Sequence, residues 1–132
     1  MSTTIQPKGW ARPRGYSNGV VATGRFLSIA GQVGWDPTNA VATFPETFAE
    51  QFDRALANVM AVLREAGGSP EHLTRMTMYV TSKAEYVAAL ADVGNAWKKH
   101  VGKSYPAMAL VQVVALLEDK AKVEIEADAV LP

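Results

Sequence analysis

The alternation of apolar and polar positions is most informative near the C-terminal end of the chain. Tyr105–Leu117 is apolar on both alternating faces except for Gln112. In Val123–Val130, the apolar residues Val123, Ile125, Ala127 and Ala129 alternate with Glu124, Glu126 and Asp128. Both patterns repeat every second residue, which predicts two β-strands. A strand that is apolar on both faces must be covered on both, and a single short chain has difficulty doing so alone.

Two helices are expected in the middle of the chain. The first follows Thr47, which opens a capping box, and it ends at Gly67-Gly68. Its apolar residues recur every three or four positions, at Phe48, Phe52, Leu56, Val59 and Leu63. The second helix begins at another capping box after Ser82 and ends near Gly102. Its buried stripe is expected to contain Tyr86, Leu90, Val93 and Trp97.

The remaining apolar runs predict three more strands. Val20–Thr23 and Phe26–Val33 flank a turn at Gly24-Arg25, so they are expected to form a hairpin. Leu73–Thr81 reads as a strand, with Met76, Met78 and Val80 on one face and Arg75, Thr77 and Tyr79 on the other. Residues 1–14 are rich in proline, glycine and arginine, which predicts an irregular arm held in place by Trp10.

The order of these elements is strand, strand, helix, strand, helix, strand, strand. It predicts an α+β fold in which two helices pack on one face of a single mixed or antiparallel sheet, within one domain of residues 1–132. If Ala107 and Ala109 face the helices, the open face carries Met108, Leu110, Val114 and Leu116. Burying about four such side chains is worth about 6–12 kcal/mol. We therefore expect other subunits to cover this face.

Composition narrows the possible functions. The 132 residues include 13 basic and 13 acidic side chains and are 48% hydrophobic, which disfavours disorder and a general polyanion-binding surface. The absence of cysteine excludes disulfides, thiolate metal sites and thiol nucleophiles. His72 and His100 lack the partners of a metal site, so we expect neither a metal nor a cofactor. The chain has no secretion signal and no apolar run of about 18 residues, which predicts a cytoplasmic protein that makes no contact with a membrane.

Four stretches carry a resemblance to a known family. They are Ala30–Gln32 after an early strand, Gln51–Gly67 as the first helix, the Tyr105–Ala107 turn into a strand, and Lys122–Ala127 near the end. In these stretches the chain resembles the RidA/YjgF family of small enamine and imine deaminases. The resemblance implies a chorismate-mutase-like homotrimer with clefts between its subunits. A small molecule binds in each cleft, where 2-enamine or 2-imine acids are hydrolysed to 2-keto acids.

The resemblance also implies which residues form the site. Tyr16 would line the cleft beside Gly31 and Gln32, and Glu124 corresponds to the glutamate that positions water. The deaminases of the family bind the substrate carboxylate with an arginine just after Pro-Ala, and this chain has Met108 there. A charged, hydrogen-bonded pair of that kind contributes roughly 1.5–3 kcal/mol, which methionine cannot replace. Simple 2-imino acids are therefore not the expected substrates.

The polar candidates also have structural interpretations. Glu124, or its neighbour Glu126, could orient water as a general base or lie on a solvated strand edge. Tyr16 could donate a hydrogen bond to a bound imine or carbonyl group, or it could only close the start of the first strand. Gln112 could satisfy a backbone group or face the cleft as a ligand donor and acceptor.

Recognition of the ligand has its own alternatives. Met108 and Leu110 either pack in the interior or contact an apolar part of the ligand. Arg12, Arg14 and Arg75 are candidates for a cation that has moved from the usual position. The first two come shortly before the cleft tyrosine, and the third lies on the open face of its strand. The alternative for each is an ordinary exposed arginine.

Three functions are consistent with these residues. The first is a hydrolase that acts on an enamine or imine other than a simple 2-imino acid. The second is a trimer that binds or senses a small metabolite without converting it. The third is cleavage of single-stranded RNA, an activity attributed to some members of the family. Balanced charge and the lack of a basic, aromatic stripe disfavour binding to nucleic acid.

Overall fold

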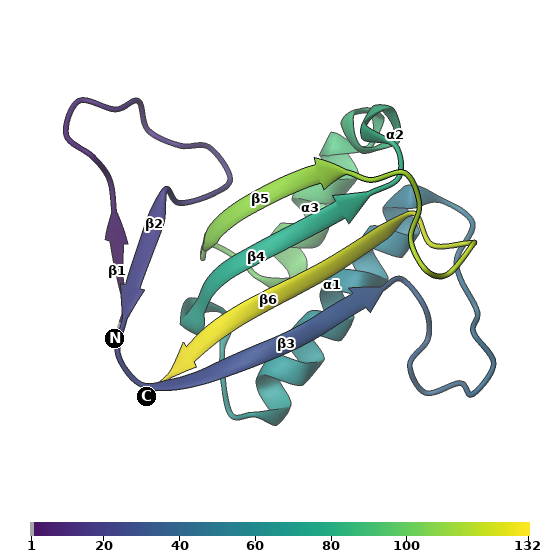
Figure 1. The fold of residues 1–132 in the computed structure, drawn as a ribbon, viewed down its shortest axis with the longest axis horizontal. Coiled ribbons are helices and arrows are strands. Elements are labelled where there is room, and N and C mark those ends of the chain that lie inside the picture. Colours follow the sequence, from purple (N-terminus) through teal and green to yellow (C-terminus); the bar gives the residue numbers. More distant parts are fainter. Residues whose placement is uncertain (1) are drawn as a thin grey trace.

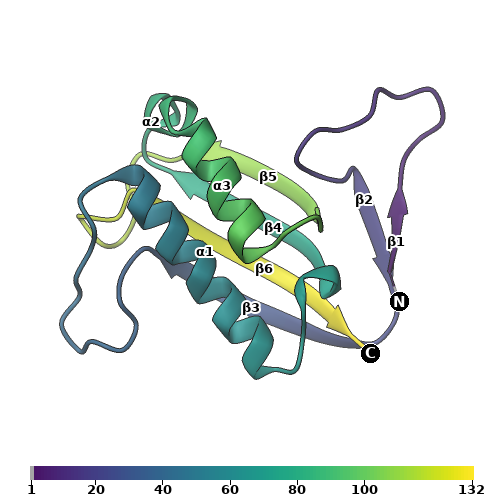
Figure 2. The same cartoon turned by 180° about the vertical axis from the view of Figure 1, so that it is seen from behind.

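The computed structural model of the chain describes residues 2–132. It contains a four-stranded sheet with helices on one face, and a separate two-stranded ribbon (Figure 1). The elements are, in order, β1 (Ser2–Ile5), β2 (Gly19–Ala22), β3 (Arg25–Val33), α1 (Phe48–Glu65), a 3₁₀ turn (Pro70–His72), β4 (Leu73–Val80), α2 (Lys83–Ala88), α3 (Leu90–His100), β5 (Ala107–Gln112) and β6 (Val123–Leu131). Figure 2 shows α1 and α3 side by side across the sheet. The predicted α+β fold, with helices on one face of a mixed sheet, is confirmed.

Strand β6 lies inside the main sheet, whose order is β3-β6-β4-β5. It is antiparallel to both of its neighbours, whereas β5 is parallel to β4. The alternation predicted for β6 is confirmed, because its buried side chains are Val123, Ile125, Ala127 and Ala129. Strand β4 also buries the predicted face, which contains Met76, Met78 and Val80. Both strands therefore turn their apolar faces towards the helices.

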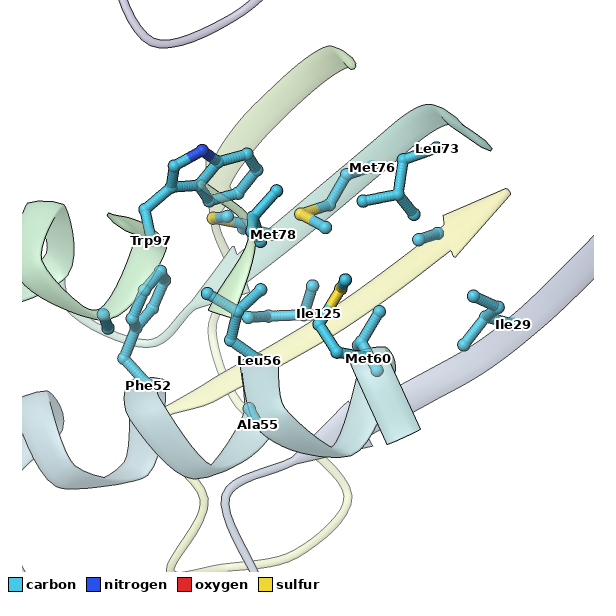
Figure 3. Close-up of a cluster of buried hydrophobic side chains, with 14 of the residues drawn as sticks. Ile29, Phe52, Ala55, Leu56, Met60, Leu73, Met76, Met78, Trp97 and Ile125 are labelled. Carbon is cyan, nitrogen blue, oxygen red and sulfur yellow. The ribbon is translucent and has the colours of Figure 1, made fainter. Parts of the chain in front are cut away.

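Helix α1 begins and ends where the sequence predicts. The hydroxyl of Thr47 accepts a hydrogen bond from the backbone N–H of Glu50 (3.1 Å), which caps the first turn. Gly67 follows the last turn with a φ of 85°, a conformation that favours glycine. The apolar stripe, including Phe52 and Leu56, is buried against the sheet (Figure 3). None of the helices in residues 2–132 is long and apolar enough to cross a membrane.

The second predicted helix is two helices in the structure. Ser82 caps α2 as predicted, because its hydroxyl accepts the N–H of Glu85 (3.2 Å). Ala89, with φ −102° and ψ 15°, then leaves helical geometry. The axis changes direction there, because α2 lies beyond the end of β4 whereas α3 runs back along the sheet (Figures 1 and 2). The prediction for Leu90 is wrong, since it is 51% exposed, whereas Trp97 is buried.

The start of the chain pairs differently from the prediction. Residues Ser2–Ile5, expected to be irregular, form a strand that is antiparallel to β2. The predicted hairpin of β2 with β3 is wrong, because β3 pairs with β6 instead. Gly24 separates the two strands, with a φ of 153° and so close to Leu131 that a Cβ atom would lie 2.0 Å from the carbonyl oxygen. The chain changes direction at this contact.

A glutamine holds the N-terminal arm together. The Gln6 side chain donates to the carbonyl groups of Trp10 (3.2 Å) and Ala11 (3.1 Å), and it accepts from the Asn18 side chain (2.6 Å). Trp10 does not hold the arm as predicted, because its side chain is 63% exposed. The loop of residues 6–18 is therefore closed by polar contacts.

Strand β5 is shorter than the predicted strand Tyr105–Leu117. The last contact with β4 is the hydrogen bond from the N–H of Val113 to the carbonyl of Val80 (2.8 Å). Strand β4 ends at that residue and offers no further partner. The chain then leaves the sheet, and Val114 and Leu117 are exposed.

The faces of β5 are the reverse of the prediction. The parallel register places Met108 beside Met76 and Leu110 beside Met78. Both β4 residues are buried, so Met108 and Leu110 also lie on the helix side, packed against the core. The face without helices instead carries Arg75, Thr77, Tyr79, Glu124, Glu126 and Asp128, together with the exposed Phe26 of β3 and Val111 of β5. Met108, Leu110, Val114 and Leu116, which were predicted to make this face apolar, therefore do not form it.

A buried glutamine joins α1 to two loops. The Gln51 amide donates to the carbonyl groups of Pro45 (2.9 Å) and Lys120 (3.0 Å), and its oxygen accepts the N–H of Lys122 (2.8 Å). Gly34 lies against the same turn, where a Cβ atom would be 2.5 Å from the backbone oxygen of Gln51. These contacts fix the end of β3 and the start of β6 relative to α1.

Candidate functional site

The N-terminal arm, α3 and β5 enclose a hollow of about 430 Å³ on the helix side of the sheet. Four residues selected from the sequence line it, namely Arg14, Tyr16, Met108 and Leu110. We call it the apolar hollow. The other lining side chains include Met78, Tyr86, Val93, Trp97 and Tyr105. The two β5 residues reach the hollow because the register turns them towards α3.

Two backbone contacts bring Tyr16 to this place. The N–H of Ser17 bonds the carbonyl of Pro106 (3.0 Å), and the Ser17 hydroxyl donates to the carbonyl of Tyr105 (2.5 Å). Ser17 also forms an isolated bridge with Ala107, at the start of β5. The arm is thus attached to β5 immediately beside the hollow, and the Tyr16 side chain is partly exposed at its border.

An aromatic pair forms one wall of the apolar hollow. The rings of Trp97 and Tyr105 stack, with centroids 5.8 Å apart and planes 8° from parallel. Trp97 is only 8% exposed, and its indole N–H has no hydrogen-bond partner within residues 2–132. Figure 3 shows the nitrogen on the edge of the ring that points away from Phe52 and Leu56. A buried donor without a partner costs about 1–3 kcal/mol.

The second group of predicted residues lies on the other face of the sheet, on β3 and β6. Strand β3 has a bulge between Ile29 and Gln32, where two of its residues oppose one residue of β6. At Gly31 a Cβ atom would lie 2.2 Å from Oε2 of Glu124, so the carboxylate occupies the space that glycine leaves open. The Gln32 side chain donates to the carbonyl of Ala30 (3.1 Å). We call Gly31, Gln32 and Glu124 the carboxylate group.

Glu124 and Glu126 share one face of β6 but differ in their contacts. The Tyr79 hydroxyl donates to Oε2 of Glu126 (2.9 Å). This hydrogen bond raises the pKa of Tyr79, and desolvation and the charges of both glutamates add to the effect. The phenol therefore stays neutral and remains hydrogen-bonded to the Glu126 carboxylate. The Glu124 carboxylate accepts no hydrogen bond and forms no ion pair with the rest of residues 2–132, which leaves it available as a base.

Two other candidates lie outside both groups. Arg75 lines a separate hollow of about 330 Å³ on the face without helices, together with Glu126 and Asp128. These two carboxylates make it a poor place for an anion. The amide oxygen of Gln112 accepts the N–H of Lys83 (2.8 Å) at the start of α2, so its side chain satisfies a backbone group. Within residues 2–132 no three acidic or histidine side chains gather as a metal site.

The structure adds residues to the hollow that the sequence did not single out as site residues. Trp97 was expected only as part of a buried helix stripe, and Tyr105 only as the start of a strand. An unpartnered indole N–H cannot be recognised in a sequence, because it depends on what lies around the ring. The available signal was the pair of aromatic residues on either side of the Gly102 helix stop.

The apolar hollow and the carboxylate group lie on opposite faces of the sheet. The hollow is on the helix side, where Met78 and Leu110 line it, whereas Glu124 projects from the face without helices. Strand β5 is also at one edge of the sheet and β3 at the other (Figure 1). One chain therefore holds two sets of candidate residues that do not meet. The fold and these two sets define a small α+β protein with a divided candidate site.

Comparison with other proteins identifies the family. The chain belongs to the Rid family, also called YjgF, and residues 10–131 match the family model described as Endoribonuclease L-PSP. It is similar to the crystal structure of the Rid family protein YyfB from Yersinia pestis, with 32% identity, 98% of each chain covered and a TM-score of 0.83.

Two further relatives carry more specific names. The 2-iminobutanoate/2-iminopropanoate deaminase of Bos taurus is 32% identical over 115 residues, which cover 87% of this chain and 79% of that protein. The structure of Escherichia coli TdcF with bound serine is 28% identical, covers 98% of this chain and 99% of that one, and has a TM-score of 0.72. These names describe the relatives.

Replacing Gly31 by alanine is expected to leave the free energy of unfolding within about 1 kcal/mol of the wild-type value. The new methyl group meets only the flexible end of the Glu124 side chain, which can move away. Gly34→Ala is the matched control, because its methyl group meets the backbone of Gln51 and is expected to cost about 1–3 kcal/mol. Urea unfolding measures both. Equal losses for the two variants would contradict a movable Glu124 carboxylate.

Proposed function

We propose that the chain is a Rid-type hydrolase that acts on an enamine or imine in clefts between the subunits of a homotrimer. The observation that carries the proposal is the free carboxylate of Glu124 above Gly31, on the opposite face of the sheet from the apolar hollow. Membership of the Rid family supports it. In the trimer, the carboxylate group of one copy completes the apolar hollow of its neighbour.

The chemistry requires only water and two side chains. An enamine first tautomerises to the imine, and the Tyr16 hydroxyl donates a hydrogen bond to the imine nitrogen. Glu124 accepts a proton from water while the water oxygen forms a bond to the imine carbon. Glu124 returns this proton to the nitrogen, which gives a carbinolamine, and then accepts the proton of the carbinolamine hydroxyl group. This second proton also passes to the nitrogen as the C–N bond breaks, and ammonia leaves. A carbonyl compound remains, and no cofactor takes part.

The substrate differs from that of the deaminases in the group beside the reacting carbon. Met108 and Leu110 offer an apolar surface at the floor of the hollow, where a 2-imino acid would place its carboxylate. An unpaired carboxylate in such a place loses its hydration without gaining a partner. The bovine relative is named for 2-imino acids, and this floor supports a different substrate here.

Binding without turnover is the second candidate. The apolar hollow, with Met108 at its floor, is suited to hold a small metabolite. A trimer of this kind would act as a carrier or sensor. The endoribonuclease activity in the description of the family model has less support, because the chain has 13 basic and 13 acidic side chains.

Glu124→Gln is expected to lower the rate of imine hydrolysis by about 100-fold or more, because glutamine cannot accept the proton from water. The assay measures ammonia released from a panel of imines generated in place, including imines of apolar ketones and of aromatic acids. Glu126→Gln is the matched control, and it should retain most of the activity because Glu126 is bonded to Tyr79. Ammonia release that is no faster than in buffer, for every compound, would refute the hydrolase and favour the binding trimer.

Met108→Arg is expected to create hydrolysis of 2-iminopropanoate, because it returns a cation to the floor of the hollow. The charge-assisted contact is worth roughly 1.5–3 kcal/mol, or about 10- to 100-fold in kcat/KM. Met108→Gln controls for polarity without charge and should not show the gain. If the arginine variant folds and hydrolyses no 2-iminopropanoate, the site differs from that of the deaminases in more than this residue.

A further inference from the structure

A second hollow adjoins the apolar hollow at the N-terminal arm. It has a volume of about 640 Å³ and is formed mainly by residues 4–17. The two hollows share four lining residues, Arg14, Gly15, Tyr16 and Tyr105. Arg14 therefore stands at the boundary between the apolar hollow and the arm. We call this boundary the rim.

The charges around the rim have a single sign. Among the described residues, Arg14 is the one charged residue that lines the apolar hollow. Arg12 and Arg14 are the charged residues that line the second hollow. No aspartate or glutamate among residues 2–132 lines either one. Neither arginine forms a salt bridge within residues 2–132, whose ion pairs are made by Lys99, His100 and Lys122.

Two other cations, Arg75 and Lys99, lie beside carboxylates. Arg75 shares its hollow with Glu126 and Asp128, and Lys99 lies 3.6 Å from Asp53. An isolated guanidinium at the edge of an apolar hollow is different, because it can pair with an incoming carboxylate through two parallel hydrogen bonds. The rim thus favours an anionic ligand.

Contacts within the chain position the segment that carries the arginines. On the N-terminal side, Gln6 bonds the carbonyl groups of Trp10 and Ala11. On the C-terminal side, Ser17 bonds Tyr105 and Pro106. The segment between Ala11 and Ser17 is thus attached at both ends, next to the apolar hollow.

We propose that Arg14, supported by Arg12, binds the carboxylate of a ligand whose apolar body fills the hollow of Met108 and Leu110. The cation that the deaminases carry at the floor of the hollow would in this chain lie at the rim. The ligand is therefore an amphipathic acid with its carboxylate further from the reacting carbon than in a 2-imino acid. This inference relies on the proposed function only for the choice of the apolar hollow as the ligand site.

The lining favours a small acid over RNA as the anion. Met78, Val93, Met108 and Leu110 provide an apolar interior that suits an alkyl or phenyl group. Single-stranded RNA needs a basic groove along which successive bases stack. Two arginines at one rim give a single contact point, whereas a groove would need a row of them.

The test compares an acid with its uncharged isostere. Calorimetry measures binding of 3-phenylpropanoate and 3-phenylpropanamide to the full-length protein in low salt. We expect the acid to bind about tenfold more tightly or better, and Arg14→Gln to remove the difference without affecting the amide. Arg75→Gln is the matched control and should behave as the wild type, since its guanidinium lies on the other face next to two carboxylates. Arg12→Gln should give a smaller loss than Arg14→Gln.

Several results would overturn the inference. The first is equal binding of the acid and the amide, and the second is an equal loss of acid binding in Arg14→Gln and Arg75→Gln. The third is no binding of either compound up to about 10 mM. The fourth is binding of a short single-stranded RNA, in place of the acid, that depends on Arg14. Acid binding without any hydrolysis would refute the hydrolase alone, and hydrolysis without preference for acids would refute this inference alone.

Discussion

Parallel pairing of β5 with β4 determines where this chain can bind a ligand. The register places Met108 and Leu110 next to buried methionines of β4, on the side that α3 covers. The start of β5 also receives Ser17, which brings Tyr16 and Arg14 to the same place. A shift of one residue would turn both apolar side chains to the opposite face of the sheet. The hollow would then lose its floor.

The carboxylate group depends on a different local feature, the bulge of β3. The extra residue there places Gly31 under Glu124, and only glycine leaves room for the carboxylate at that point. Because one rigid sheet separates this group from the apolar hollow, chemistry that needs both requires a second copy of the chain. The trimer that we propose rests on this separation and on membership of the family.

Local rules in the sequence were sufficient for α1, β4 and β6. Capping at Thr47, the stop at Gly67 and strict alternation along β6 each depend on a few neighbouring residues. The faces of β5 were not predictable, because a strand that is apolar on both faces carries no alternation to orient it. The pairing of β1 with β2 was not predicted, because β1 (Ser2–Ile5) has only four residues and all of them are exposed. For the site, resemblance selected Tyr16, Met108 and Glu124, but their division between two faces of the sheet required the structure.

We propose that the candidate site is complete only between copies of the chain. The different substrate that we propose on the basis of Met108 leaves the requirement for a second copy unchanged. Multi-angle light scattering of the purified protein at micromolar concentration tests the claim most directly. Our account predicts a particle with three times the mass of one chain. A particle with the mass of a single chain would contradict it.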